Sequence, residues 1–158
     1  MKKITNIDFF SQSKKWNRRI PKLKKISKDT IEKMIIYFNK NEEFNLSLIF
    51  SDKKRMIKLN KKFKNTYSDT DVLTFVSKIS NKGLGKIIYC DIFFSIDTIE
   101  TFIRKYKVKF YDHYCHLLIH SILHINGYDH KNLKQFNKMK KEEIEILKNF
   151  KIKNPYAY

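Results

Sequence analysis

Hydrophobic residues in the first third of the chain follow the period of a strand in some segments and that of a helix in others. Segment 4–10 is short and apolar-rich, and segment 44–50 alternates between apolar and polar positions, so both are predicted strands. A helix is predicted from about Pro21, because apolar residues recur three and four positions apart. These residues are Ile26, Ile31, Met34, Ile35 and Phe38. Ser51 and Asp52 offer N-caps for a basic helix that runs to about Phe63.

The rest of the chain contains two more predicted strands, followed by helices. The strands span 72–76 and 87–94, and the turn NKGLG between them contains Gly83 and Gly85. The polar segment KNTYSD, residues 64–69, is a predicted loop. Helices are predicted over about 96–107, 110–126 and 132–149. Strands come early, helices dominate late, and there is no repeat or linker, so the pattern predicts one domain of the α/β or α+β class.

The composition is that of a folded, reduced protein. Of the 158 residues 42% are hydrophobic and 15% aromatic, which excludes a disordered chain, and three Gly and two Pro exclude collagen-like or low-complexity material. Cys90 and Cys115 have no CxxC spacing, so reduced thiols are expected. No secretory signal and no run of about 18 apolar residues is found. We therefore expect a cytoplasmic protein without a membrane partner.

The net charge of +18 has two explanations. Clustered Lys and Arg attract polyanions, and residues 1–79 carry +12 of this charge. However, 30 of the 34 basic residues are Lys, and Ile, Asn, Phe and Tyr are also abundant. All these residue types have A/T-rich codons, so a biased genome explains much of the excess equally well. Charge alone leaves a nucleic-acid partner open.

All five histidines lie in one short segment, 113–130. They are His113, His116, His120, His124 and His130. The first four are three or four positions apart and share one face of a helix. The segment HSILHINGYDH has the pattern HxxxHxxGxxH, in which Gly127 permits the turn that brings His130 back to the helix. Three neutral imidazoles with an open fourth position are typical of a catalytic zinc site, whereas four protein ligands are typical of a structural one.

A plainer explanation exists for each histidine taken alone. A single His on this apolar helix is more often a packed core residue, but three at this spacing, with the glycine, predict a metal site made of His120, His124 and His130. His116 lies one turn earlier. It is either a functional group, behind the ligands or on the substrate side, or simply a packed or solvated residue. For His113 we expect only a solvated position.

Ser121 argues against proteolysis. In zinc proteases with the pattern HExxHxxGxxH, the Glu after the first His is the general base. Here that position is Ser121, and a serine of ordinary pKa cannot do the work of a carboxylate. A metal at this site still lowers the pKa of a water and polarises an oxygen, which suits phosphodiester hydrolysis.

The histidine segment also resembles a known family. Residues 120–130, HSILHINGYDH, are similar to the HGxLHLxGYDH signature of the endoribonuclease YbeY family. Other matching segments are Leu59-Asn60 followed by TDVLTF (70–75), CDIFFS (90–95), the helix with Glu143 and Glu145, and Asn154-Pro155-Tyr156. The resemblance therefore covers most of the chain, from about Phe44 to Tyr156.

The resemblance implies a single α+β domain, taken here as 1–158, with a small mixed sheet of about four strands packed with helices and a metal site on a late helix. It implies one Zn²⁺ bound by His120, His124 and His130, and no small-molecule cofactor. The implied activity is single-strand-specific RNA cleavage in small-subunit rRNA 3′-end processing, with rRNA and the small ribosomal subunit as partners. Lys64 aligns with the family's basic residue, usually Arg, and is the candidate catalytic residue that binds phosphate.

Lys64 keeps the charge of that Arg but lacks its bidentate fork, and a solvated surface lysine is the alternative for it. The other departures from the family pattern are Ser121 for Gly, Cys90 for the Gly before Asp91, and the absence of a Pro before Thr70. Asp71 and Asp91 are candidates for structural or ligand-orienting carboxylates, and Asp71 also for a cap at a strand start. Asp129 either orients His130 or forms the turn.

Two main hypotheses of function follow. The first is a zinc-dependent endoribonuclease of rRNA maturation. The second is a metal-stabilised assembly factor that binds rRNA or the small subunit without intrinsic cleavage. A metalloprotease is a third hypothesis, weakened by Ser121.

Overall fold

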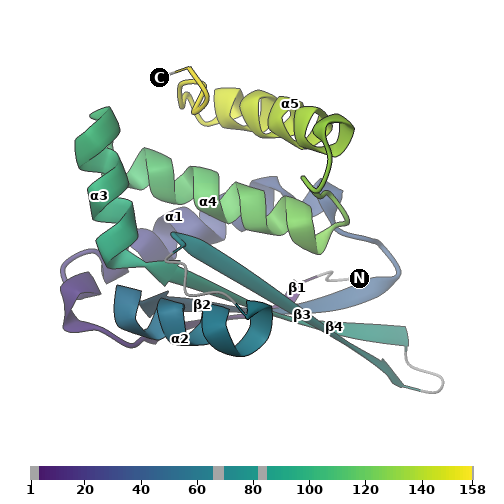
Figure 1. Cartoon of the computed structure of the whole chain (residues 1–158). Coiled ribbons are helices and arrows are strands. Elements are labelled where there is room, and N and C mark those ends of the chain that lie inside the picture. The colour runs from purple at the N-terminus through teal and green to yellow at the C-terminus, as the bar shows by residue number, and fades with distance from the viewer. Residues whose placement is uncertain (1–3, 66–69, 82–84, 158) are drawn as a thin grey trace.

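The structure, a computed structural model, describes residues 4–65, 70–81 and 85–157. Its four strands form one mixed sheet in the order β1-β2-β4-β3 (Figure 1). They are β1 (Ile4–Ser11), β2 (Glu42–Ser51), β3 (Val72–Asn81) and β4 (Gly85–Ser95). β2 runs parallel to both β1 and β4, whereas β3 pairs antiparallel with β4 at the edge of the sheet.

Helices cover both faces of this sheet. They are α1 (Ile20–Lys33), α2 (Lys53–Lys64), α3 (Ile96–Tyr106), α4 (Phe110–Ile125) and α5 (Leu133–Asn149). Short 3₁₀ segments span Lys14–Trp16 and Ile35–Tyr37. Figure 1 shows α1 and α4 on one side of the sheet, α2 on the other, and α5 on the outer side of α4. Parallel neighbours need a crossover, and α1 provides it between β1 and β2.

Successive side chains of β4 point to opposite faces of the sheet. Cys90, Ile92 and Phe94 are buried, and the Phe94 ring lies 4.8 Å from that of Tyr114 on α4. Phe93 points to the opposite face, where its ring lies 5.8 Å from that of Phe75. The core of the protein therefore lies between the sheet and the α1 and α4 layer.

The predicted elements are confirmed, and so is the α+β class with one mixed sheet. Asp52, not Ser51, caps α2, because its side chain accepts a hydrogen bond from the Arg55 amide at 3.0 Å. The helix predicted from Pro21 ends at Lys33, and the apolar pattern beyond it belongs to a 3₁₀ turn and an extended segment. β3 runs to Asn81, beyond the predicted end at 76.

Exposure explains the unpredicted part of β3. Val76 and Ile79 are exposed at this edge, so no apolar alternation marks the outer half of the strand. Of the predicted loop 64–69, Lys64 is the last residue of α2, and residues 66–69 lie outside the described part. Residues 82–84 of the predicted turn also lie outside it, and Gly85 opens β4 with φ 88°.

Among the described residues, no helix combines the length and the apolar character that a membrane span requires.

Candidate metal centre

The helix α4 places three histidines on one face. Most of its residues are buried, but His116, His120 and His124 are only partly buried. They are spaced four residues apart, so their rings follow one another along the helix. The ring centroids of His120 and His124 lie 4.5 Å apart. The sequence prediction of a shared helical face is therefore confirmed.

A turn at Gly127 returns the chain to this face. Gly127 has φ 91°, and its amide donates to the His124 carbonyl at 3.1 Å, while the Tyr128 amide donates to the Leu123 carbonyl at 3.0 Å. This pair of hydrogen bonds is the left-handed glycine turn that commonly ends helices. An added Cβ would meet nothing within 4 Å, so only the backbone conformation requires glycine here. The turn carries His130 back to His120 and His124.

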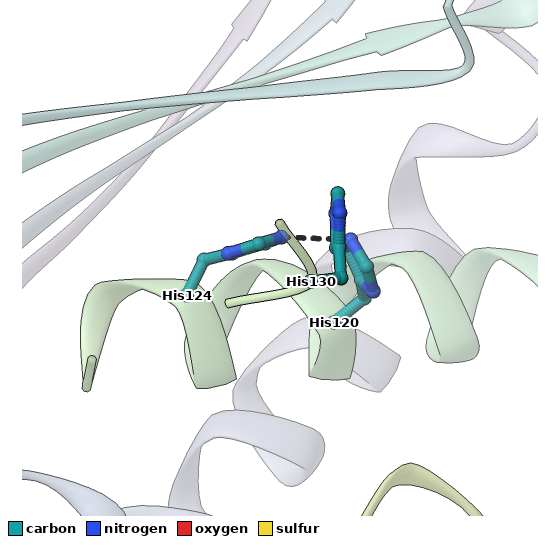
Figure 2. A group of neighbouring side chains, drawn as sticks. All are labelled: His120, His124 and His130. Atoms are coloured by element: carbon teal, nitrogen blue, oxygen red, sulfur yellow. Dashed lines mark hydrogen bonds between the residues drawn. The ribbon is translucent and has the colours of Figure 1, made fainter. Parts of the chain in front are cut away.

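The ligand atoms of His120, His124 and His130 lie within 4.8 Å of one another (Figure 2). The Nε2 atoms of His120 and His124 are 3.0 Å apart. Two nitrogens bound to one tetrahedral zinc, each at about 2.0–2.1 Å, are separated by about 3.3 Å. The spacing of the three rings therefore fits a single metal ion.

The hydrogen bonds behind the rings fix which nitrogen is available. Nδ1 of His124 donates to the Tyr128 carbonyl at 2.9 Å, and Nδ1 of His120 donates to the carboxylate of Glu143. Both partners only accept, so in the neutral rings both Nε2 atoms carry lone pairs. Two lone pairs 3.0 Å apart repel each other unless a cation lies between them. Burial, together with the His120 and His130 rings, lowers the pKa of His124 and favours the neutral form that binds metals.

Glu143 supports this centre from α5. Its buried carboxylate also accepts from Nε2 of His116 at 3.0 Å and from the hydroxyl of Tyr156. Burial raises the pKa of Glu143, but hydrogen bonds from His116 and His120 outweigh it and bring the pKa to about 2. A carboxylate behind a metal-binding imidazole fixes the ring and raises its basicity.

Sequence reasoning used Glu143 only as part of a matching helix and missed this role. The available signal was an acidic residue within the buried stripe of α5, which also contains Met139, Ile146 and Leu147. His116 hydrogen-bonds to Glu143, the carboxylate behind His120, so of its predicted roles the one behind the ligands agrees with the structure. The solvated position expected for His113 is wrong: the residue is 5% exposed and its ring stacks on Phe102 at 4.0 Å.

Of the three candidate carboxylates, Asp71 and Asp129 lie at the cavity of the metal ligands, and Asp91 does not. Asp71 lines the cavity of the metal ligands, and its Oδ2 lies 3.4 Å from Nε2 of His113. Burial opposes ionisation of Asp71, but the contact with His113 outweighs it and lowers the pKa. Asp91 is exposed on the sheet face opposite α4, so of its two predicted roles the ligand-orienting one is wrong. Asp129 accepts from the backbone amide of His130 at 2.8 Å and thus forms the turn.

Ser121, the residue in place of the protease glutamate, is fully buried. Its side chain points into the core and away from the partly buried face of the ligands. It therefore neither acts on a substrate nor narrows the approach to the centre.

A cavity of about 640 Å³ opens beside the three ligands and is lined by Lys64 and Lys131 as well as by Asp71. Lys64 is the last residue of α2, so this helix end brings a cation to the histidines of α4. Nearby, Nδ2 of the buried Asn60 donates to Oγ1 of Thr70 at 3.2 Å, which ties α2 to the entry of β3. Lys64 and the three candidate histidine ligands thus line the same cavity.

A mixed sheet and a three-histidine centre backed by a buried carboxylate define an α+β protein with a candidate metal-dependent active site. The sequence model described as Endoribonuclease YbeY matches residues 8–151. A curated relative, Endoribonuclease YbeY of Bartonella quintana (strain Toulouse), is 29% identical over 156 residues, 98% of each chain. The chain belongs to the endoribonuclease YbeY family, and its activity class is that of a hydrolase that cleaves RNA.

A solution structure of a Thermotoga maritima protein is also similar. Its TM-score is 0.47 at 24% identity, over 92% of this chain and 91% of that one.

Proposed function

We propose that the protein is a zinc-dependent endoribonuclease, specific for single-stranded RNA, that acts in rRNA maturation at the 3′ end of small-subunit rRNA. One domain, residues 1–158, carries the activity. The observation that supports the metal most directly is the 3.0 Å separation of the His120 and His124 Nε2 atoms, whose rings are held by hydrogen bonds at Nδ1.

One Zn²⁺ is held by His120, His124 and His130 in this proposal. Within the described part of the chain, no fourth His, Cys, Asp or Glu belongs to this group, a donor set typical of a catalytic site. When bound, the metal supplies Lewis acidity that lowers the pKa of a water and polarises a phosphate oxygen. The neutral rings of His120 and His124 already hold their proton at Nδ1, so no proton has to move between the ring nitrogens when a metal binds at Nε2.

Lys64 and Lys131 supply positive charge at the same cavity. A lysine ammonium there binds the phosphate next to the cleaved bond and offsets the charge that develops during the reaction. The assigned catalytic role of Lys64 rests on this placement and on the resemblance of its segment to the family. The net charge of +18 agrees with rRNA and the small ribosomal subunit as cytoplasmic partners. The proposed reaction uses no small-molecule cofactor.

Metal analysis together with single-turnover cleavage tests this function. Purified protein should contain one zinc per chain, and His120→Ala should lose it. A 3′-extended small-subunit rRNA should be cut in its single-stranded part by wild type and not by folded His124→Ala. Removal of zinc by a chelator should stop cleavage, and zinc should restore it. Equal cleavage by both proteins would indicate a contaminating nuclease and favour the assembly factor without intrinsic cleavage.

A further inference from the structure

A second cavity, of about 450 Å³, adjoins the metal centre, and Lys64 is not among the residues that line it. The two cavities share His120, Asp71 and Val72 as lining residues, so a ligand in the second one lies next to the metal ligands. Its volume is in the range of small-molecule binding sites. The function proposed above does not account for it.

Rings make up much of the wall of this cavity. They belong to Phe102, Tyr106, His113, His116 and Tyr156. The His113 ring stacks on Phe102, and the Tyr156 ring lies 5.7 Å from that of His116, so several rings are held by their neighbours. Preformed aromatic walls accept flat, unsaturated rings, and unpaired bases are bound in this way.

Polar groups of this wall lack protein partners. Nδ1 of His113 and Nδ1 of His116 make no hydrogen bond within the described residues, whereas Nε2 of His113 lies 3.4 Å from Oδ2 of Asp71. Buried polar atoms without a partner are unfavourable, so these two nitrogens are polar groups beside the cavity that the described residues leave unsatisfied. Asp71 adds a carboxylate that accepts N–H donors.

A third cavity, of about 280 Å³, lies beside the second and shares the lining residues His113, His116 and Pro155 with it. Four lysines surround it, namely Lys107, Lys109, Lys151 and Lys153, against a single acidic residue, Asp112. The lysines come from the link between α3 and α4 and from the segment after α5. This arrangement fits a phosphate group.

We propose that these two cavities bind one unpaired nucleotide of the RNA next to the cleaved bond, with its base among the rings and a phosphate among the lysines. The proposal rests on the proposed function, in which RNA is cut at the metal centre. A base in a duplex is stacked on both faces and cannot enter, so the pocket excludes double-stranded RNA. Asp71 favours bases with an exocyclic amino group over uracil.

A base-deletion scan tests the aromatic part. A set of single-stranded RNAs that wild type cleaves carries one abasic nucleotide at successive positions. Wild type and Tyr106→Ala are compared on this set. Tyr106 is suitable because it lies at the end of α3 and is 37% exposed. The cleavage rate of wild type should fall about five- to 100-fold when the abasic site lies at one particular position beside the cleaved bond. Tyr106→Ala should cleave intact RNA more slowly and lose this penalty. An unchanged penalty in the variant, or no sensitive position, would overturn the proposal.

Binding measurements test the lysine part and separate the two proposals. By fluorescence anisotropy, Lys153→Glu should bind the intact RNA several-fold more weakly with a smaller salt dependence. The matched control is Lys25→Glu, an equal charge change at an exposed position of α1 that lines none of these cavities and should bind as wild type. Equal losses in both variants would overturn the phosphate site.

If wild type cuts no RNA, the proposed function fails by itself. The pocket then still predicts that wild type, but not Tyr106→Ala, prefers intact over abasic RNA in the same binding assay, and no preference would overturn it.

Discussion

Glu143 on α5 accepts a hydrogen bond from Nδ1 of His120 on α4, and its other oxygen accepts from His116 at 3.0 Å. One carboxylate thus fixes the tautomer of His120 and joins two helices at the metal centre. Its negative charge also increases the electron density at Nε2 of His120, the atom that faces His124. In the proposed metal site, α5 therefore contributes to metal affinity without supplying a ligand.

Glu143→Gln should weaken zinc binding by about 10- to 100-fold, because the substitution keeps the size of the side chain but removes its charge. A competition titration with a chromophoric chelator measures the affinity directly. Glu145→Gln is the control on the same helix, since Glu145 is exposed and pairs with Lys148 at the surface. Wild-type affinity in Glu143→Gln would show that the carboxylate only packs the two helices together.

Gly127→Ala should destabilise the metal-free protein by about 1 kcal/mol, through conformation alone. The left-handed φ of 91° disfavours any Cβ, yet the added methyl meets no atom within 4 Å. For a chain of this size the melting temperature should fall by about 2–4 °C. Differential scanning calorimetry measures the melting temperature. It should fall less in Gly127→Asn than in Gly127→Ala, because Asn tolerates the left-handed backbone region. A melting temperature unchanged in both variants would contradict the assigned role of the turn.

The cluster of His120, His124 and His130 was predictable because its arrangement is local. His120 and His124 are one helical turn apart, and a glycine turn returns His130 within six residues, so spacing alone carries the information. The pair of Asp71 and His113 was not predictable in this way, since packing of β3 against α4 creates it. The alternation of β4, by contrast, already places Asp91 opposite the buried Ile92. The strand period therefore puts Asp91 and Ile92 on opposite faces, and the packing of α4 on the Ile92 face excludes the ligand-orienting role considered for Asp91.

Cys90 and Cys115 should not react with a thiol reagent in the native protein. Both are free and buried, and burial raises the pKa of Cys90 to about 12 and that of Cys115 to about 11. Titration with an aromatic disulfide at pH 8 should find no reactive thiol before denaturation and two after it. Fast labelling of the folded protein would contradict this expectation.

The same raised pKa values define a dependence of stability on pH. The folded state holds both thiols protonated, so their contribution is complete below the ordinary thiol pKa of 9.0 and declines as the pH rises through about 11 and 12. Replacing both cysteines by alanine should reduce the loss of stability above pH 9. Urea unfolding at pH 8 and pH 10 measures this difference, and identical losses in the two proteins would refute it.

Lys64→Ala should lower kcat/KM for single-stranded RNA about tenfold or more, because it removes a charged contact to phosphate. Lys64→Arg should retain or exceed wild-type activity, since a guanidinium presents two parallel donors to a phosphate where lysine presents a point charge. Lys62→Ala is the control: Lys62 belongs to the same helix but does not line the cavity of the metal ligands, so its kcat/KM should change less than about twofold. Zinc content should be equal in all three variants, which separates loss of phosphate binding from loss of the metal. Equal decreases in Lys62→Ala and Lys64→Ala would mean that the charge of α2 acts at a distance and that Lys64 has no individual role.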